Sequence, residues 1–86
     1  MMYNERKAEI LEFVEDYGPV TSRHVSDYCG VEIHDARVLL KRYPKNGLLY
    51  RRKVKGNRFG LREYMITDRG SSKLEYLKSR FLEKNF

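Results

Sequence analysis

The sequence has few of the residues that cross-link a protein or anchor it in a membrane. Its 86 residues include a single cysteine, Cys29. One cysteine excludes an intramolecular disulfide and a cysteine-based zinc set, and it favours a reducing, intracellular compartment. No apolar run approaches the ~18–20 residues of a membrane-spanning helix, and the N-terminal residues lack the pattern of a signal peptide. We therefore expect an intracellular protein without a membrane anchor.

Motifs for catalysis and for metal binding are also missing. The sequence contains no nucleophile elbow, no glycine-rich phosphate loop and no constellation of paired carboxylates. His24, Cys29 and His34 are the only histidines and cysteine, and they are spread along the chain without a fourth partner. We expect no enzymatic activity, no metal and no cofactor. No small-molecule ligand can be read from the sequence.

Positive charge is in excess. The chain has 18 Lys and Arg against 12 Asp and Glu, a net charge of +6. The segment from 36 to 62, here called the basic segment, contains no acid but ten of these cations: Arg37, Lys41, Arg42, Lys45, Arg51, Arg52, Lys53, Lys55, Arg58 and Arg62. Solvated surfaces normally mix both signs, so this segregation predicts a polyanionic partner, above all nucleic acid. We therefore expect the protein to be associated with the nucleoid. The absence of Gln and Trp beside abundant Lys, Arg, Glu and Tyr favours a thermophilic or archaeal source.

Apolar periodicity predicts a first helix over about residues 4–17. Asn4 would cap its start, and Gly18-Pro19 would end it. Ile10, Val14 and Tyr17 recur at helical spacing, whereas Phe13 falls off that stripe. We expect the stripe to face the core.

A second, short helix is predicted over about residues 22–28. Thr21 suits its N-cap, and Gly30 suits the left-handed residue that closes it. Val25 and Tyr28 would point inward. Two short helices joined by a tight turn with glycine form a helix-turn-helix, and in such motifs the second helix is the one that contacts DNA.

The third helix, over about residues 33–43, has two chemically different faces. Ala36, Leu39, Leu40 and Tyr43 lie on the apolar face at i, i+3, i+4 and i+7. The opposite face is mostly basic. Pro44 is expected to end the helix. A short basic helix held by its apolar side is the kind of element that the major groove of DNA admits.

The period then changes to that of a hairpin, over about residues 48–66. The turn is predicted at Gly56-Asn57, with strands over 48–55 and 58–66. Gly60 could mark a bulge that changes the phase of the returning strand. Thr67-Asp68 would cap a last helix over about 68–84. The fold class is therefore α+β but mostly α, in a single domain over residues 1–86.

This order of elements resembles a known family. The stretches VTSRHVSDYCGVEIHDARVLLKRYPKNGLLYRR and EYMITDRGSSKLEYL are similar to the winged helix-turn-helix domains of MarR-like or PadR-like prokaryotic transcriptional regulators. The similarity covers roughly residues 19–77. It implies a three-helix core, a hairpin wing over 48–66 and an additional C-terminal helix. By the same resemblance, the helix over 33–43 is the recognition helix, and the wing contacts the minor groove or the DNA backbone.

Three sets of residues are then expected to contact double-stranded DNA. On the recognition helix they are Ile33, His34, Arg37, Val38, Lys41, Arg42 and Lys45; on the wing they are Arg51, Arg52, Lys53, Lys55, Asn57, Arg58 and Arg62; at the start of the second helix, Ser22 and Arg23 would hold a phosphate. Arg37 is the best candidate for reading a base, with a phosphate contact as its alternative. The family usually has Ser or Thr where this chain has Glu32 and Asp35, for which we expect a capping role, with a hydrogen bond from a cytosine amino group as the alternative.

The terminal helices have more apolar side chains than one small core needs. This surplus predicts a two-fold homodimer through Tyr3, Phe13, Tyr76, Phe81, Leu82 and Phe86. The leading hypothesis is a sequence-specific, dimeric regulator of transcription. The alternatives are a winged helix that binds a protein in a replication, transcription or viral assembly, and a non-specific architectural DNA or RNA binder.

Overall fold

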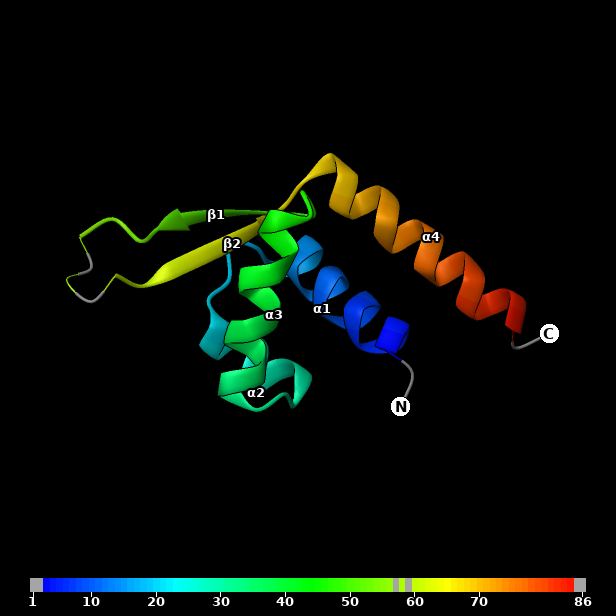
Figure 1. Ribbon diagram of the computed structural model, residues 1–86, viewed down its shortest axis with the longest axis horizontal. Coiled ribbons are helices and arrows are strands. Elements are labelled where there is room, and N and C mark those ends of the chain that lie inside the picture. The colour runs from blue at the N-terminus through cyan, green and yellow to red at the C-terminus, as the bar shows by residue number, and fades with distance from the viewer. Residues whose placement is uncertain (1–2, 57, 59, 85–86) are drawn as a thin grey trace.

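The computed structural model describes the backbone of residues 3–56, 58 and 60–84 and the side chains of residues 5–56, 58 and 60–80. Its elements, in chain order, are α1 (Tyr3–Tyr17), α2 (Ser22–Cys29), α3 (Ile33–Lys45), β1 (Leu49–Lys53), β2 (Arg62–Ile66) and α4 (Asp68–Lys84). The β hairpin and α4 project in opposite directions from a helical centre (Figure 1). The predicted fold class, mostly helical with a two-stranded hairpin, is confirmed.

Helix α1 buries a wider face than its sequence predicts. The helix begins at Tyr3, so Asn4 lies inside it rather than at its N-cap. Phe13 is only 7% exposed, although it was expected off the buried stripe, whereas Tyr17 was expected inward and is 59% exposed. The reason is that α1 packs against α2, α4 and β2 at once. A helix covered from several sides cannot be read from one stripe.

The predicted caps of α2 are confirmed. The Thr21 hydroxyl accepts from the His24 N–H at 3.3 Å, and His24 Nδ1 accepts from the Thr21 N–H at 3.1 Å. Gly30 closes the helix with φ of 67°, in the left-handed region that glycine adopts without strain. Val25 is fully buried, but Tyr28 is 62% exposed and not inward as predicted. The Tyr28 ring instead packs against Phe13 and Tyr17 of α1, and much of it stays in contact with solvent.

Helix α3 extends two residues beyond its predicted end. Pro44 lies inside its last turn, because proline removes only its own N–H and the turn closes through later donors. The Asn46 N–H donates to the Tyr43 carbonyl at 3.1 Å, and the Gly47 N–H donates to the Pro44 carbonyl at 3.0 Å. Both bonds span three residues, which is the tighter pattern common at helix ends.

The hairpin is shorter than predicted and regular. Its strands pair antiparallel from Leu49↔Ile66 to Lys53↔Arg62 without interruption. Gly60, with φ of 68°, precedes β2, so the expected bulge within the returning strand was wrong. Val20 extends the sheet by one bridge, because its N–H donates to the Tyr64 carbonyl at 3.0 Å and its carbonyl accepts from the Tyr64 N–H at 2.7 Å.

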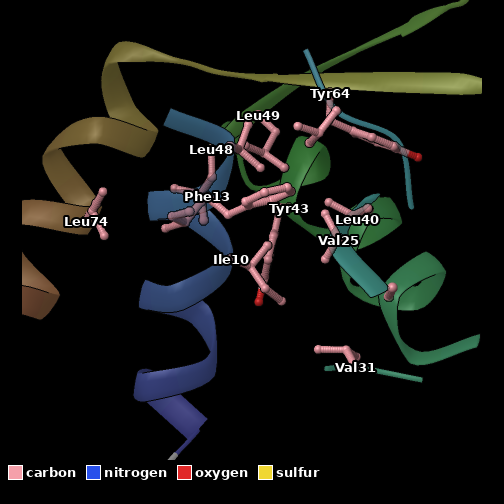
Figure 2. Close-up of a cluster of buried hydrophobic side chains, with 14 of the residues drawn as sticks. Ile10, Phe13, Val25, Val31, Leu40, Tyr43, Leu48, Leu49, Tyr64 and Leu74 are labelled. Carbon is pink, nitrogen blue, oxygen red and sulfur yellow. The ribbon is translucent and has the colours of Figure 1, made fainter. Parts of the chain in front are cut away.

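The core lies where α1, α2, α3, α4 and the hairpin base meet, and Figure 2 shows Tyr43 near its centre. The buried face of α3 is confirmed for Ala36, Leu40 and Tyr43, and Leu39 packs partly buried against the same cluster. The described buried residues are Ile10, Leu11, Phe13, Val14, Val20, Val25, Val31, Ala36, Leu40, Tyr43, Leu48, Leu49, Tyr64, Leu74 and Leu77. In the part of the chain described, no helix has both the length and the apolar character needed to cross a membrane.

A polar junction fixes α3, the hairpin and α4 relative to one another. The Thr67 hydroxyl lies 2.6 Å from the Gly47 carbonyl and 3.0 Å from the Leu48 carbonyl, and it accepts from the Gly70 N–H at 2.9 Å. Thr67 therefore caps α4 as predicted, and it also holds the turn that follows α3. The angle at which the hairpin leaves α3 is set here.

Candidate nucleic-acid interface

The outward face of α3 is basic and solvent-exposed. His34, Arg37, Lys41, Arg42 and Lys45 are all exposed. Val38 is 41% exposed, and Ile33 is half-buried. Because Ala36, Leu40 and Tyr43 hold the opposite face in the core, the helix presents its cations from a rigid support. The structure thus brings the predicted α3 residues to one side of a single helix.

The hairpin carries the second predicted set. Arg51, Arg52, Lys53, Lys55 and Arg58 are exposed, and Arg62 is half-buried. Asn57 lies outside the described residues. These cations lie on and beyond the strands that project from the helical centre (Figure 1), where a long, narrow, positively charged element can reach along a duplex.

One cation of the hairpin has a partner within the hairpin itself. The Arg52 Nε donates to Glu63 Oε1 at 2.6 Å, and the two residues face each other across β1 and β2. The Glu63 side chain is 20% exposed and that of Arg52 60% exposed. The charge of Arg52 is therefore partly neutralised, although the sequence predicts the same DNA contact for Arg52 as for the neighbouring cations.

The N-termini of α2 and α3 differ in what they offer a phosphate. At α2, Ser22 is half-buried and Arg23 exposed, next to a helix end that favours negative charge. At α3, Glu32 occupies the N-cap position but makes no side-chain capping hydrogen bond, so the expected capping role was wrong for Glu32. Glu32 is thus the residue just before the first helical residue, and it is exposed to solvent. Asp35 lies exposed in the first turn.

Sequence reasoning missed Arg69. The hairpin returns the chain to the end of α3, so the Arg69 side chain lies next to Gly47. A Cβ added to Gly47 would be 3.4 Å from Arg69 Cδ. Arg69 is exposed and lies just beyond the basic segment in sequence, at the start of α4. It adds a cation near the end of α3, beside the turn. Only the tertiary contact reveals this, because Arg69 belongs to a different helix.

Two acids of α1, Glu12 and Glu15, contact α4. Lys78 Nζ lies 2.9 Å from Glu12 Oε1, and the Ser71 hydroxyl donates to Glu15 Oε2 at 2.9 Å. The Glu12 hydrogen bond is the main cause that raises the pKa of Lys78. These contacts join the N-terminal and C-terminal helices, neither of which carries the basic segment.

The described residues predicted to form a dimer interface differ in their exposure to solvent. Phe13 lies in the core of the single chain, so its expected surface role was wrong: it is buried under the α2 ring of Tyr28, 4.4 Å away between ring centroids. Tyr76 is 53% exposed, with Lys73 Nζ 5.1 Å from its ring centroid. The side chains of Tyr3, Phe81 and Leu82 and all of Phe86 lie outside the described residues.

No group of three or more His, Cys, Asp or Glu side chains among the described residues is placed to hold a metal ion. His24 is engaged with Thr21 at the start of α2, and Cys29 is half-buried at its end. Burial is the main cause that raises the pKa of the Cys29 thiol to about 11; Glu9 adds to the increase, and Arg6 opposes it. A thiol so protonated is a poor metal ligand near neutral pH.

Comparison with known proteins identifies similar folds. The chain matches no protein-family model, and no curated protein matches it in sequence. Among solved structures it is similar to the YusO protein of Bacillus subtilis, with 16% identity and a TM-score of 0.78 over 86% of this chain and 52% of that one. It is also similar to a mutant of Staphylococcus aureus MepR bound to an oligodeoxyribonucleotide, with 16% identity and a TM-score of 0.77 over 93% of this chain and 59% of that one.

A MarR-family transcriptional regulator from Rhodococcus sp. RHA1 matches with 20% identity and a TM-score of 0.73, over 87% of this chain and 52% of that one. The chain thus spans little more than half the length of these proteins. Identities this low define a shared backbone arrangement. The chain has the winged helix-turn-helix fold of the MarR-family transcriptional regulators.

Proposed function

We propose that this chain is a double-stranded DNA-binding domain that acts in a sequence-specific regulator of transcription. The observation that carries the proposal is the placement of the basic segment: its cations lie on the outward face of α3 and on the projecting hairpin, while the apolar side of α3 is fixed in the core. The fold supports it, since one similar structure, that of MepR, contains a bound oligodeoxyribonucleotide.

In this proposal α3 enters the major groove and the hairpin follows the adjacent backbone or minor groove. Arg37 lies in the middle of α3 and reads a base, because a guanidinium pairs with guanine through two hydrogen bonds. Lys41, Arg42 and Lys45, nearer the C-terminal end of α3, contact phosphates. Ser22 and Arg23 hold a phosphate at the start of α2. Affinity then comes largely from counterion release.

The proposal includes a homodimer, whose two copies of α3 lie about 34 Å apart on a palindromic site. Tyr76 on α4 and the further positions Tyr3, Phe81, Leu82 and Phe86 remain its proposed contacts; Phe13 does not, because it is buried. The start of α1 and the end of α4 both point away from the hairpin (Figure 1), so contacts there leave the basic faces open. Sedimentation equilibrium tests the dimer directly.

The test of DNA binding is fluorescence anisotropy on random and selected duplexes across a salt series. We expect a steep fall of log K with log salt and one sequence bound about 10³-fold or more above the rest. Steep salt dependence without sequence preference would indicate an architectural role. Equal binding to duplex RNA would indicate a general polyanion binder, and no binding at low salt would leave a protein partner as the function.

A charge-matched pair of variants makes the test specific to the interface. The double variant Lys53→Ala/Lys55→Ala removes two hairpin cations, and Lys73→Ala/Arg80→Ala removes two cations of α4. Both lower the net charge by two. We expect the salt slope to fall by about one to two units only in the hairpin variant. Equal losses in both would mean that overall charge, not this surface, governs binding.

A further inference from the structure

A shallow pocket opens between the C-terminal end of α1 and the outer face of α2, with a volume of about 570 Å³. None of the described residues that line it belongs to the predicted DNA contacts. The lining residues are Phe13, Tyr17, Pro19, Val20, His24, Asp27 and Tyr28.

Helical spacing explains why these side chains converge. On α1, Phe13 and Tyr17 are four residues apart, and on α2, His24, Asp27 and Tyr28 follow at i, i+3 and i+4, so each set lies on one helix face. Phe13 and Val20 are buried and form the floor, at 7% and 2% exposed. The tyrosines are exposed and form the walls.

The three aromatic rings are in mutual contact. Phe13 and Tyr28 stack with centroids 4.4 Å apart and planes 19° from parallel. Tyr17 lies tilted against both, at 5.3 Å from Phe13 and 5.6 Å from Tyr28. Each tyrosine is held by the buried ring yet remains more than half exposed to solvent. Held aromatic rings with free surface are suited to bind a ligand at little entropic cost.

The charge around this pocket is opposite to that of the chain as a whole. Asp27 lines it, and none of its described lining residues is Lys or Arg. The pKa of the Tyr28 hydroxyl is raised, first by the charge and hydrogen bond of Tyr17, then by slight burial and by Asp16. Asp16 is a cause that does carry a negative charge near neutral pH, so it joins Asp27 as an acid near the rings. Tyrosine ring faces add to this, since their quadrupole attracts cations.

We propose that this pocket binds a small organic cation, an alkylated ammonium or similar group attached to an apolar body. The cation lies against the ring faces of Tyr17 and Tyr28 with Asp27 as its counter-charge. The apolar body contacts Pro19 and the floor. This binding activity is separate from the proposed DNA contact, because the two sets of residues do not overlap.

The test titrates the ¹⁵N-labelled chain with benzyltrimethylammonium chloride and follows backbone and tyrosine ring signals. Benzyl alcohol and sodium benzoate, which carry a neutral and a negative group on the same ring, are the matched ligands. We expect shifts confined to the ends of α1 and α2 with saturable binding of the cation. Benzyl alcohol should bind at least about fivefold more weakly, and benzoate more weakly still because Asp27 repels it.

Two variants and a matched control assign the site. Tyr28→Leu keeps apolar surface but removes a ring face, and we expect about a fivefold loss of affinity for the cation. Asp27→Asn should cost about threefold, as an exposed ion pair does. Tyr50→Leu removes a tyrosine of similar exposure on β1, at a position outside every proposed interface, and it should leave the affinity unchanged. Circular dichroism confirms that each variant is folded.

The proposal is overturned if benzoate binds as tightly as the cation, if the shifts lie elsewhere, or if Tyr28→Leu and Tyr50→Leu behave alike. DNA affinity of the same samples is measured by anisotropy without ligand. Failure of the pocket therefore shows in the titration alone, and failure of the DNA proposal shows in the anisotropy alone.

Discussion

Arg52 Nε and Glu63 Oε1 lie 2.6 Å apart, across two residues that face each other in the hairpin. Glu63 is the first acid after the basic segment, and its side chain is mostly buried. The pair joins β1 to β2 close to the cations that we propose to contact DNA. Its carboxylate also offsets one of them, so the hairpin is less basic than its cations alone indicate.

Replacing Glu63 is expected to strengthen DNA binding. Glu63→Gln removes a negative charge from the hairpin and leaves Arg52 without its ionic partner. We expect non-specific affinity to rise about two- to fivefold at low salt, with a steeper salt slope. Glu75→Gln on the exposed side of α4 makes the same charge change away from the hairpin. Anisotropy should show the increase only for Glu63→Gln; equal increases would place the effect in net charge.

Arg37 and Lys41 are expected to differ in kind. Both are exposed on α3, one turn apart. Arg37→Ala should weaken the selected sequence by about 1–3 kcal/mol and weaken random DNA much less, because it removes a base contact. Lys41→Ala should weaken both by similar factors and lower the salt slope by about one. Parallel titrations of the two duplexes measure the difference, and a uniform loss for Arg37→Ala would make it a phosphate contact.

Gly70 is expected to tolerate no side chain. A Cβ at this position would lie in contact with the Leu48 carbonyl oxygen and 2.8 Å from Ile66 Cγ1. Helix propensity alone predicts that Gly→Ala stabilises α4 by about 1 kcal/mol, but the clash at the α3–hairpin–α4 junction should dominate. We expect Gly70→Ala to lower the free energy of unfolding by about 2 kcal/mol or more.

Urea unfolding measures this change. Ser72→Ala, at an exposed position two residues further along α4, is the control and should stay within about 0.5 kcal/mol of the parent. If Gly70→Ala were as stable as Ser72→Ala, α4 would not approach the α3–hairpin turn as closely as the structure shows.

The Cys29 thiol is expected to react slowly in the folded chain. Burial, with Glu9, raises its pKa from 9.0 to about 11, so its thiolate fraction at pH 8 is about 100-fold lower than in the unfolded chain. Because the folded pKa lies above the unfolded one, the stability linked to this thiol is complete below pH 9. It is lost as the pH rises through about 11.

A disulfide-exchange reagent such as dithionitrobenzoate measures the rate. We expect slow reaction at pH 8 that accelerates roughly tenfold per pH unit up to pH 10, and fast reaction at pH 8 in denaturant. Equal rates with and without denaturant at pH 8 would contradict the burial of Cys29.

Local signals in the sequence predicted much of the fold correctly. Helix α2 begins after Thr21 and ends before Gly30, as predicted. An N-cap and a left-handed residue both act on backbone groups within about four residues, so these ends can be predicted locally. The apolar face of α3 follows from its period. One local signal was misleading: Pro44 was predicted to end α3, yet the final turn closes through the N–H groups of Asn46 and Gly47, just after the proline.

The aromatic residues show a different limit, because contacts between helices decide their environment. Phe13, Tyr17 and Tyr28 were each assigned to the wrong environment, and all three lie together in the proposed cation pocket. Their burial depends on how α1 and α2 cross, and neither helix specifies that crossing by its own period. Likewise, the Arg69 contact with Gly47 joins two elements that are separated by the whole hairpin.

Residue type and short-range spacing were sufficient to predict the element order, the apolar face of α3 and the concentration of cations between residues 36 and 62. The contacts between elements became visible only in the packed fold: the Arg52–Glu63 pair, the Thr67 junction, the close approach at Gly70 and the pocket between α1 and α2. The physical reason is that such contacts arise when several helix and strand faces pack into one dense core. The packing, and not the apolar period of each helix alone, then decides which side chains are buried.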